Sequence, residues 1–342
     1  MGEKIKQRIY YCWNKLLSFT WAFCFLIIGA RGLGKTYRVK KFVGKDFLYN
    51  DAKFIWLRDT EAAIEELSAN EGKAFFDDIF TNEKCFKNCT GKIEGRNIII
   101  NGKQAGLIMP VRSFHKYKGN SFESYTNIVF DEFIPESQQQ YIGDRALQFI
   151  NTISTIGRTR KNFRVFMTAN AIDKGDPILE MLGININKGF GYYFNKKKGV
   201  VLHYAENSEA FNKKNLESNA GRLASDTRYG ENLLNNQFSV NDTFLFTKRK
   251  PCDIIGIYYN KLNEAVRIYR AKDGSEYYAC KDLSTMGYNY LRYVFDVAQV
   301  TEDKQLVGRD VMQFLTDLMA SKMLLFESRY VQKVFLSIVK GG

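Results

Sequence analysis

The stretch FLIIGARGLGKT, residues 25–36, decides the fold of this chain. Its second part, GARGLGKT, matches the pattern G-x-x-x-x-G-K-[ST] in full. The residues before it are apolar, as in a buried parallel strand, and the residues after it can start a helix. This order predicts a phosphate-binding loop between a strand and a helix, with the N-terminus of the helix facing anionic phosphates.

The residue types in this loop indicate a nucleoside triphosphate as the ligand. Glycines allow the backbone to approach phosphate oxygens, Lys35 places a positive charge on the β- and γ-phosphates, and the Thr36 hydroxyl ligates magnesium. The sequence therefore predicts ATP and Mg²⁺ as cofactors. We expect the nucleotide to contact the whole loop: Gly29, Ala30, Arg31, Gly32, Leu33, Gly34, Lys35 and Thr36.

A second apolar segment, TNIVFDEF (residues 126–133), delivers two carboxylates. We expect Asp131, at the end of a strand, to hold the magnesium ion indirectly. Glu132 is then the catalytic base that polarises the attacking water. Because simple nucleotide binding does not require this second carboxylate, its presence favours an ATPase over a non-catalytic nucleotide-binding protein.

A third apolar segment, FRVFMTANA (residues 163–171), ends in small polar residues. Asn170 either senses the γ-phosphate or simply terminates a strand. Just before this segment, TIGRTRKNFR (residues 155–164) carries Arg158 and Arg160. An arginine here either enters the site of a neighbouring subunit, which implies a ring, or belongs to a solvated or nucleic-acid-binding surface.

Composition is that of a folded, basic protein. The 342 residues carry a net charge of +13, and 45% of them are hydrophobic. This chain length suits two domains, and the charge suits a polyanionic partner, although it is also compatible with a merely soluble basic protein. Six cysteines without a CxxC pair and only two histidines argue against a zinc centre or a disulfide framework, and favour a reducing cytoplasm.

The apolar run Leu16–Ile28 raises the question of a membrane segment. A spanning helix needs roughly 20 apolar residues. This run is shorter and ends in the glycine loop, so we expect no membrane partner. Tyr10, Tyr11 and Trp13 precede the run, and either stack on the nucleotide base or pack in the core.

Two hairpins are expected in the first part of the chain. NIIINGKQAGLIMPV (residues 97–111) has Asn101-Gly102 as a tight turn. GYYFNKKKGVVLHYAE (residues 191–206) carries three lysines at its tip and is predicted to form an edge of the main sheet.

The remainder predicts a linker and a second domain. Residues 206–240 are rich in Asn, Ser, Lys and Glu, which indicates a small helical linker. Three short β-branched and aromatic runs follow, DIIGIYYN, AVRIYRA and EYYACKD, and predict a meander. Two amphipathic helices come next, the first carrying Val307, Val311, Phe314, Leu315 and Leu318. The predicted domains are 1–205, the linker 206–240, and 241–342.

The motifs, in this order, resemble the ASCE class of P-loop ATPases and, more narrowly, the DNA-packaging ATPases of φ29-type bacteriophages. The resemblance is carried by IIGARGLGKT, FIWLRD, TNIVFDEF, the arginine before FMTANA, and AGRLASDTRYGENLLNNQF. Arg31 occupies the position of an arginine common in large-terminase loops, four residues before the lysine. Arg58 matches a basic position near the nucleotide, but Asp59, Thr60 and Glu61 follow it where a second basic residue is expected.

The resemblance implies a homomeric ring, a pentamer in this family, docked on a portal vertex through a packaging RNA. Such a ring drives double-stranded DNA into a procapsid by ATP hydrolysis, in the host cytoplasm. It implies that Arg158 is a finger acting in trans, with Arg160 as its substitute. Lys116 and Lys118, in the basic loop FHKYKGNSFESY, are expected to hold DNA phosphates, an ordinary charged loop being the alternative.

The second domain resembles the RNase H-like nuclease domain of large terminases. Such nucleases place a carboxylate in the first strand, because two metal ions need converging acids. This chain has Tyr258 there, and Asp296 alone cannot build a metal pair. We therefore expect an α/β protein with a mostly parallel P-loop sheet, a helical linker and a vestigial nuclease that serves RNA, portal or DNA binding. The alternatives are an active nuclease and a helicase-like ATPase.

Overall fold

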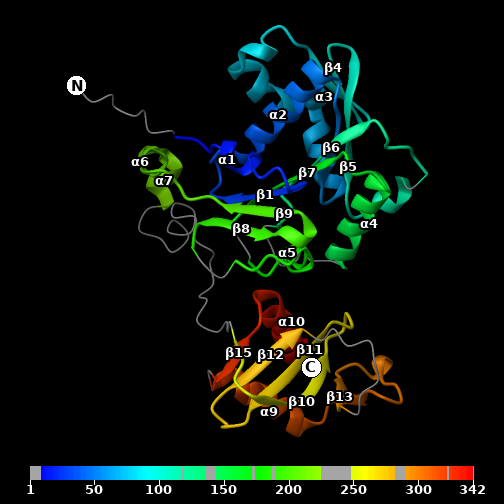
Figure 1. Cartoon of the computed structure of the whole chain (residues 1–342), viewed down its shortest axis with the longest axis vertical. Coiled ribbons are helices and arrows are strands. Elements are labelled where there is room, and N and C mark those ends of the chain that lie inside the picture. Colours follow the sequence, from blue (N-terminus) through cyan, green and yellow to red (C-terminus); the bar gives the residue numbers. More distant parts are fainter. Residues whose placement is uncertain are drawn as a thin grey trace. The chain divides into compact units, whose positions relative to one another are not determined.

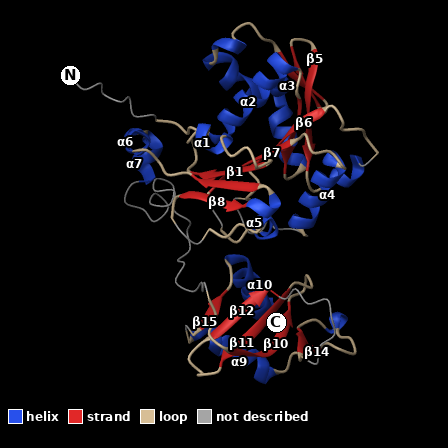
Figure 2. Cartoon of the chain, in the orientation of Figure 1, coloured by secondary structure: helices blue, strands red, loops and turns tan. Residues whose placement is uncertain are grey.

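The computed structural model describes residues 9–117, 119–135, 144–171, 174–186, 189–224, 248–281, 290–321 and 323–341. The described residues of 1–172 and 181–239 form one compact unit, and those of 173–180 and 240–342 form a second. Each unit has its own sheet (Figures 1 and 2). No helix in these described ranges is long and apolar enough to cross a membrane.

The first unit is built on a nine-stranded sheet in the order β3-β4-β5-β2-β6-β7-β1-β9-β8. The six strands from β5 to β9 in this order are parallel to one another, and a hairpin closes each edge. The strands are β1 (Cys24–Gly29), β2 (Lys53–Arg58), β3 (Gly91–Glu94), β4 (Asn97–Ile100), β5 (Lys103–Pro110), β6 (Tyr125–Asp131), β7 (Arg164–Asn170), β8 (Gly191–Asn195) and β9 (Val200–Tyr204).

The predicted strand–loop–helix unit is confirmed and lies inside this sheet. Every residue of β1 is buried, because β1 runs between β7 and β9. After the glycine loop, α2 (Lys35–Asn50) begins at the lysine of the motif. The apolar run before the loop is therefore an interior parallel strand, as its composition predicts.

Helices cover both faces of the sheet. On one face, Val39 and Val43 of α2 share a core with Val129 of β6. On the other face, Phe149 of α4 (Arg145–Gly157) stacks on Phe130 of β6 with ring centroids 5.7 Å apart. Adjacent residues of one strand thus point to opposite faces and both are buried, which is why the strand reads as a continuous apolar run.

Both predicted hairpins are confirmed. Asn101 and Gly102 connect β4 to β5 with φ angles of +51° and +74°, the left-handed values that a tight two-residue turn requires. Lys196–Lys198 form a short 3₁₀ turn between β8 and β9. Since β8 has a single neighbour, it is an edge of the sheet.

Helix α3 (Glu61–Asn82) is interrupted in its middle. Asn70, Glu71 and Gly72 have φ angles of +50°, +57° and +78°. A Cβ atom added to Gly72 would lie 2.5 Å from Ile93 Cγ1, so the break is also a point of close packing. Left-handed geometry in two consecutive non-glycine residues is locally unfavourable and has to be stabilised by the surrounding packing.

The part of the predicted linker that the structure describes is helical, with α6 (Glu209–Glu217) and α7 (Asn219–Ala224). Phe211 of α6 is buried in the core of the first unit. The segment YGENLLNNQF, which belongs to the family resemblance, lies outside the described residues.

The second unit contains a six-stranded sheet in the order β14-β13-β10-β11-β12-β15. The predicted antiparallel meander is confirmed as the first three strands in chain order. The parallel additions β13, β14 and β15 are too short to be apparent in the sequence pattern. The strands are β10 (Cys252–Tyr259), β11 (Ala265–Ala271), β12 (Tyr277–Lys281), β13 (Arg292–Val294), β14 (Gln305–Leu306) and β15 (Leu324–Phe326).

The two predicted helices of this unit are α9 (Arg309–Ala320) and α10 (Arg329–Gly341). Leu315 and Leu318 of α9 are buried in the core of the second unit. Val307 lies between β14 and Gly308, the N-cap residue of α9, and is therefore not part of the helix as predicted. With the sheet, these helices give the α/β second domain that the resemblance implies.

The close contact of β5 with β2 gives a test of the fold. A Cβ atom on Gly106 would lie 2.4 Å from the backbone carbonyl oxygen of Phe54, which cannot move away without disturbing the sheet. We expect Gly106→Ala to lower the free energy of unfolding by about 2 kcal/mol. Urea denaturation checks this value.

Gly119→Ala, at a glycine with nothing within 4 Å, is the control and should change stability by no more than about 0.5 kcal/mol. Equal effects would contradict the packing.

Candidate active site

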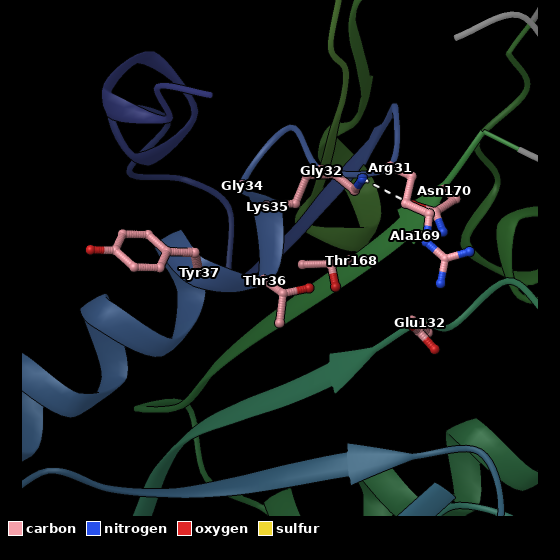
Figure 3. A pocket seen from close by; sticks show the side chains of 10 residues that line it. All are labelled: Arg31, Gly32, Gly34, Lys35, Thr36, Tyr37, Glu132, Thr168, Ala169 and Asn170. Atoms are coloured by element: carbon pink, nitrogen blue, oxygen red, sulfur yellow. Dashed lines mark hydrogen bonds between the residues drawn. The ribbon is translucent and has the colours of Figure 1, made fainter. Parts of the chain in front are cut away.

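The glycine loop after β1 requires its glycines. Gly32 and Gly34 have φ angles of +77° and +89°, which other residues rarely adopt. A Cβ atom on Gly29 would lie 2.9 Å from Leu33 Cδ2. The loop borders a pocket of about 210 Å³ (Figure 3), lined by Arg31, Gly32, Gly34, Lys35, Thr36, Tyr37, Glu132, Thr168, Ala169 and Asn170.

Lys35 is held inside the loop. Its Nζ donates to the carbonyl oxygens of Gly29 (2.9 Å) and Ala30 (2.6 Å) and to Oδ1 of Asn170 (3.1 Å). Only 6% of the residue is exposed, and burial lowers the pKa of its ammonium to about 8, against the opposing effect of Asp131. A phosphate arriving in the pocket offers this ammonium a stronger acceptor than neutral carbonyls.

Asp131 is the buried centre of the site. Its Oδ1 accepts hydrogen bonds from the Thr36 hydroxyl (2.7 Å) and from the Thr168 hydroxyl. Its Oδ2 accepts from Nη1 of Arg58 at 2.9 Å. Three different elements, α2, β7 and β2, therefore converge on one carboxylate, which is how a buried charge is satisfied.

Arg58 links the two acidic residues. While Nη1 contacts Asp131, Nη2 donates to Oε2 of Glu132 at 2.6 Å. Side-chain exposure is 12% for Arg58, 4% for Asp131 and 48% for Glu132, so the guanidinium neutralises a buried and a half-exposed carboxylate together. The sequence predicts Arg58 near the nucleotide but not these two ion pairs, because nothing in FIWLRD indicates which acidic residues the arginine contacts.

The predicted catalytic base lies at a strained point of the backbone. Glu132 has a φ angle of +55°, which is uncommon for a residue with a side chain. It borders the glycine-loop pocket and also a second pocket of about 310 Å³, lined by Arg58, Asp59, Thr60, Ala62, Ala63, Glu66, Glu132, Ile134 and Pro135. Its carboxylate can therefore be reached from two sides.

The acidic segment after Arg58 has structural partners. Asp59 pairs with Arg112 and Arg145, and the Thr60 side chain caps α3 by accepting from the backbone N–H of Ala63. Glu61 forms an ion pair with Arg96. Where the family resemblance leads one to expect a second basic residue, this chain has acids that bind its own arginines.

Arg31 and Asn170 border the glycine-loop pocket, as expected of residues near the nucleotide. Arg31 is exposed, and Figure 3 shows its side chain over the part of the pocket near Glu132. Asn170, at the end of β7, holds the Lys35 ammonium. Asn170 is thus tied to the loop in a way that an ordinary strand terminus is not.

Arg158 and Arg160 lie near the amino end of β7, and the glycine loop lies at the carboxyl ends of the parallel strands. Both arginines come before the first residue of β7. The glycine loop begins at the other end of the strands, where Gly29 of β1 pairs with Asn170 of β7. A seven-residue strand spans roughly 20 Å, further than an arginine side chain reaches. Neither arginine can therefore contact the pocket of its own chain.

These two arginines differ in their contacts. Arg158 is exposed and ends α4 with a φ angle of +48°. Arg160 is held by its own chain, since its guanidinium donates to the carbonyl oxygens of Glu123, Tyr125 and Ile156. Of the two, Arg158 has the side chain that can extend toward another molecule.

The other predicted contact residues fall into different classes. Lys116 lies exposed on a 3₁₀ turn (Phe114–Tyr117), and Lys118 lies outside the described residues. Tyr11 and Trp13 are core residues, with 5% and 7% of their surface exposed. Tyr10 is 46% exposed, so of the three aromatic residues only Tyr10 has a free surface.

The residues at the foot of the pocket fit a magnesium ion and a triphosphate. The Thr36 hydroxyl and the Asp131 carboxylate are adjacent oxygen ligands, the type that Mg²⁺ takes together with substrate phosphates. In the described ranges, no group of three or more His, Cys, Asp or Glu residues could hold a metal by itself. The Lys35 ammonium and the amides of α2 supply the positive potential that phosphates require.

In the second unit, a buried aromatic residue occupies the strand position where a nuclease would have a carboxylate. Tyr258 is 2% exposed and stacks on Tyr293 of the neighbouring β13, with ring centroids 5.2 Å apart. Burial raises the pKa of the Tyr258 hydroxyl far above its ordinary value. The Asp296 side chain accepts from the backbone N–H of Ala298 at 2.9 Å and caps a 3₁₀ turn.

Comparison with known proteins identifies the family of this chain. Residues 5–338 match the family model of the podovirus DNA encapsidation protein (Gp16). The DNA packaging protein of Bacillus phage B103 is 32% identical over 241 residues, 70% of this chain and 68% of that protein.

Two solved structures are also similar. The bacteriophage Phi-29 viral genome packaging motor assembly contains a chain with a TM-score of 0.69, 22% identity, and coverage of 97% of this chain and 99% of that one. The crystal structure of the N-terminal domain of the phi29 DNA packaging ATPase gives a TM-score of 0.50 at 26% identity, over 59% of this chain and 99% of that one. Because the family model spans nearly all of the sequence, this chain belongs to the podovirus DNA encapsidation protein (Gp16) family.

Proposed function

We propose that this protein is the ATPase of a phage DNA-packaging motor, which uses ATP hydrolysis to move double-stranded DNA into a procapsid. The observation that carries the proposal is the convergence of Thr36, Arg58 and Thr168 on Asp131, beside the glycine loop and Glu132. Membership of the Gp16 family, and the similarity to a phage DNA packaging protein, support DNA as the substrate that is moved.

The proposed chemistry assigns a role to each group in the pocket. Lys35 leaves its carbonyl partners to bind the β- and γ-phosphates, and Thr36 and Asp131 hold Mg²⁺, which when bound neutralises charge on the phosphate oxygens. Glu132 orients the attacking water and accepts its proton. Arg58 donates to both carboxylates and so holds Glu132 beside Asp131.

The position of Arg158 supports action in trans within a homomeric ring, for which the family suggests a pentamer. Arg158 lies near the amino ends of the parallel strands, and its own glycine loop lies at their carboxyl ends. An arginine finger from this position therefore has to serve a neighbouring subunit. The guanidinium then stabilises charge on the transferring phosphoryl group. Arg160 is better suited to holding the loop that presents Arg158.

The remaining partners follow from charge and family. The net charge of +13 and the exposed Lys116 suit contact with DNA phosphates without base reading. We propose that the motor assembles in the host cytoplasm at the portal vertex of the procapsid, through a packaging RNA. Tyr258 at the expected metal position supports a second domain that binds RNA, portal or DNA rather than cutting nucleic acid.

Packaging assays with two variants test the proposal. With procapsids, DNA, ATP and Mg²⁺, we expect the full chain to produce DNA protected from nuclease inside shells. Lys35→Ala should lose tight ATP binding, because the phosphates lose their cation. Glu132→Gln should bind ATP normally but hydrolyse it at least about 100-fold more slowly. Equal losses of ATP affinity in both variants would contradict the division of roles, and strand separation instead of protected DNA would indicate a helicase.

The lowered pKa of Lys35 predicts a pH dependence of nucleotide binding. Above about pH 8 the free site holds a neutral lysine, whereas bound phosphates favour the ammonium, so binding takes up a proton. We expect proton uptake near zero at pH 7 and approaching one proton at about pH 9, with affinity falling as the pH rises. Calorimetry in buffers of different ionisation enthalpy measures this uptake. Lys73→Gln, at an exposed lysine, should leave it unchanged; pH-independent uptake would refute the assignment.

Subunit mixing tests the role of Arg158. Alone, Arg158→Ala should lower the ATPase rate at least about 1,000-fold. Glu132→Gln alone should lower it at least about 100-fold. A mixture should regain activity, because some pockets combine an intact Glu132 with an intact Arg158 from the neighbour. Mixing Glu132→Gln with the double variant is the control and should regain none. Absence of complementation in the first mixture would show that Arg158 does not act in trans.

A further inference from the structure

The glycine-loop pocket has two ends. Figure 3 shows Glu132 and Tyr37 on opposite sides of Thr36. In the proposed function, which this inference rests on, Glu132 faces the γ-phosphate. The α-phosphate, the ribose and the base then extend toward Gly34 and Tyr37, at the start of α2.

An exposed aromatic ring lies at this second end. A Cβ atom on Gly34 would be 3.7 Å from Cβ and 3.8 Å from Cδ1 of Tyr10, which is ordinary contact. Gly34 is the N-cap residue of α2 and Tyr37 lies in the first turn of this helix, so Tyr10 borders the start of α2. Yet Tyr10 remains 46% exposed, whereas its neighbour Tyr11 is 5% exposed.

The backbone around Tyr10 is fixed from both sides. The N–H of Tyr11 donates to the carbonyl oxygen of Leu33 in the loop (3.0 Å), and Nε of Arg38 donates to the carbonyl oxygen of Tyr11 (2.9 Å). On the other side, the Ser208 hydroxyl donates to the carbonyl oxygen of Ile9 (3.3 Å). Tyr10 is therefore positioned before any ligand arrives.

The ring itself is oriented by a cation. Nζ of Lys214, on α6, donates to the Tyr10 hydroxyl at 2.6 Å and lies 5.0 Å from the ring centroid. Such a contact restricts rotation of the ring and leaves its remaining exposed surface to solvent. A rigid, pre-oriented aromatic surface next to a phosphate site is suited to a planar aromatic ligand, because little side-chain entropy is lost on binding.

We propose that Tyr10 is the platform on which the base of the bound nucleotide stacks, with Tyr37 at the ribose side of the pocket. Stacking of a base on an aromatic side chain contributes through the face of the ring, so the phenyl ring of phenylalanine can replace that of tyrosine. The phosphates are bound by the loop, and the base by the segment Ile9–Tyr11 together with α6.

Binding of ATP and of tripolyphosphate, which has no base, separates these contributions in the full chain. We expect Tyr10→Ala to weaken ATP binding about tenfold, within the range of about 5- to 150-fold that base stacking gives, and to leave tripolyphosphate binding unchanged. Tyr10→Phe should bind ATP within about twofold of the unaltered chain. Tyr49→Ala is the matched control, since Tyr49 is 70% exposed at the far end of α2, and should change neither affinity.

Two results would overturn the base site. Unchanged ATP affinity in Tyr10→Ala would show that the ring does not meet the base. Equal losses for ATP and tripolyphosphate would show that Tyr10 acts only by packing on Gly34. Failure of the proposed function looks different, because Lys35→Ala would then retain ATP binding, whereas failure of the base site alone leaves Lys35→Ala deficient and Tyr10→Ala normal.

Discussion

The site depends on the stabilisation of one buried carboxylate. Asp131 ends an interior strand among apolar neighbours, where an unpaired charge would be very costly. Hydroxyls from α2 and β7 and the guanidinium of Arg58 from β2 satisfy its two oxygens. Three neighbouring elements are thereby fixed relative to the glycine loop, and the loop, Glu132 and Lys35 are positioned relative to one another.

The parallel sheet explains why these groups meet. The carboxyl ends of β1, β2, β6 and β7 lie at one edge, so residues distant in the sequence gather around the start of α2. The segments that lead into these strands, including the one with Arg158, lie at the amino ends of the strands. The second unit has a different construction, in which a stacked tyrosine pair lies on the adjacent strands β10 and β13.

Much of this arrangement was predictable from local patterns. The loop motif and the apolar runs of β1, β6 and β7 identify Lys35, Thr36, Asp131 and Glu132, because their roles depend on adjacent residues. The ion pairs of Arg58 and the burial of Tyr11 and Trp13 were not predictable, since they depend on which strands become neighbours. The same limit applies to β13, β14 and β15, whose two or three residues give no periodic signal.

The location of Arg158 has a consequence for symmetry. An arginine on one edge and a pocket on the opposite edge are different surfaces, so an interface that joins them is heterologous, and a two-fold dimer cannot satisfy both copies through it. An open row of such subunits always leaves one terminal pocket without its arginine. Under the proposed trans action of Arg158, only closure by a rotation axis gives every pocket the same complement, and the closed assembly, rather than the single chain, is then the smallest uniform catalytic unit.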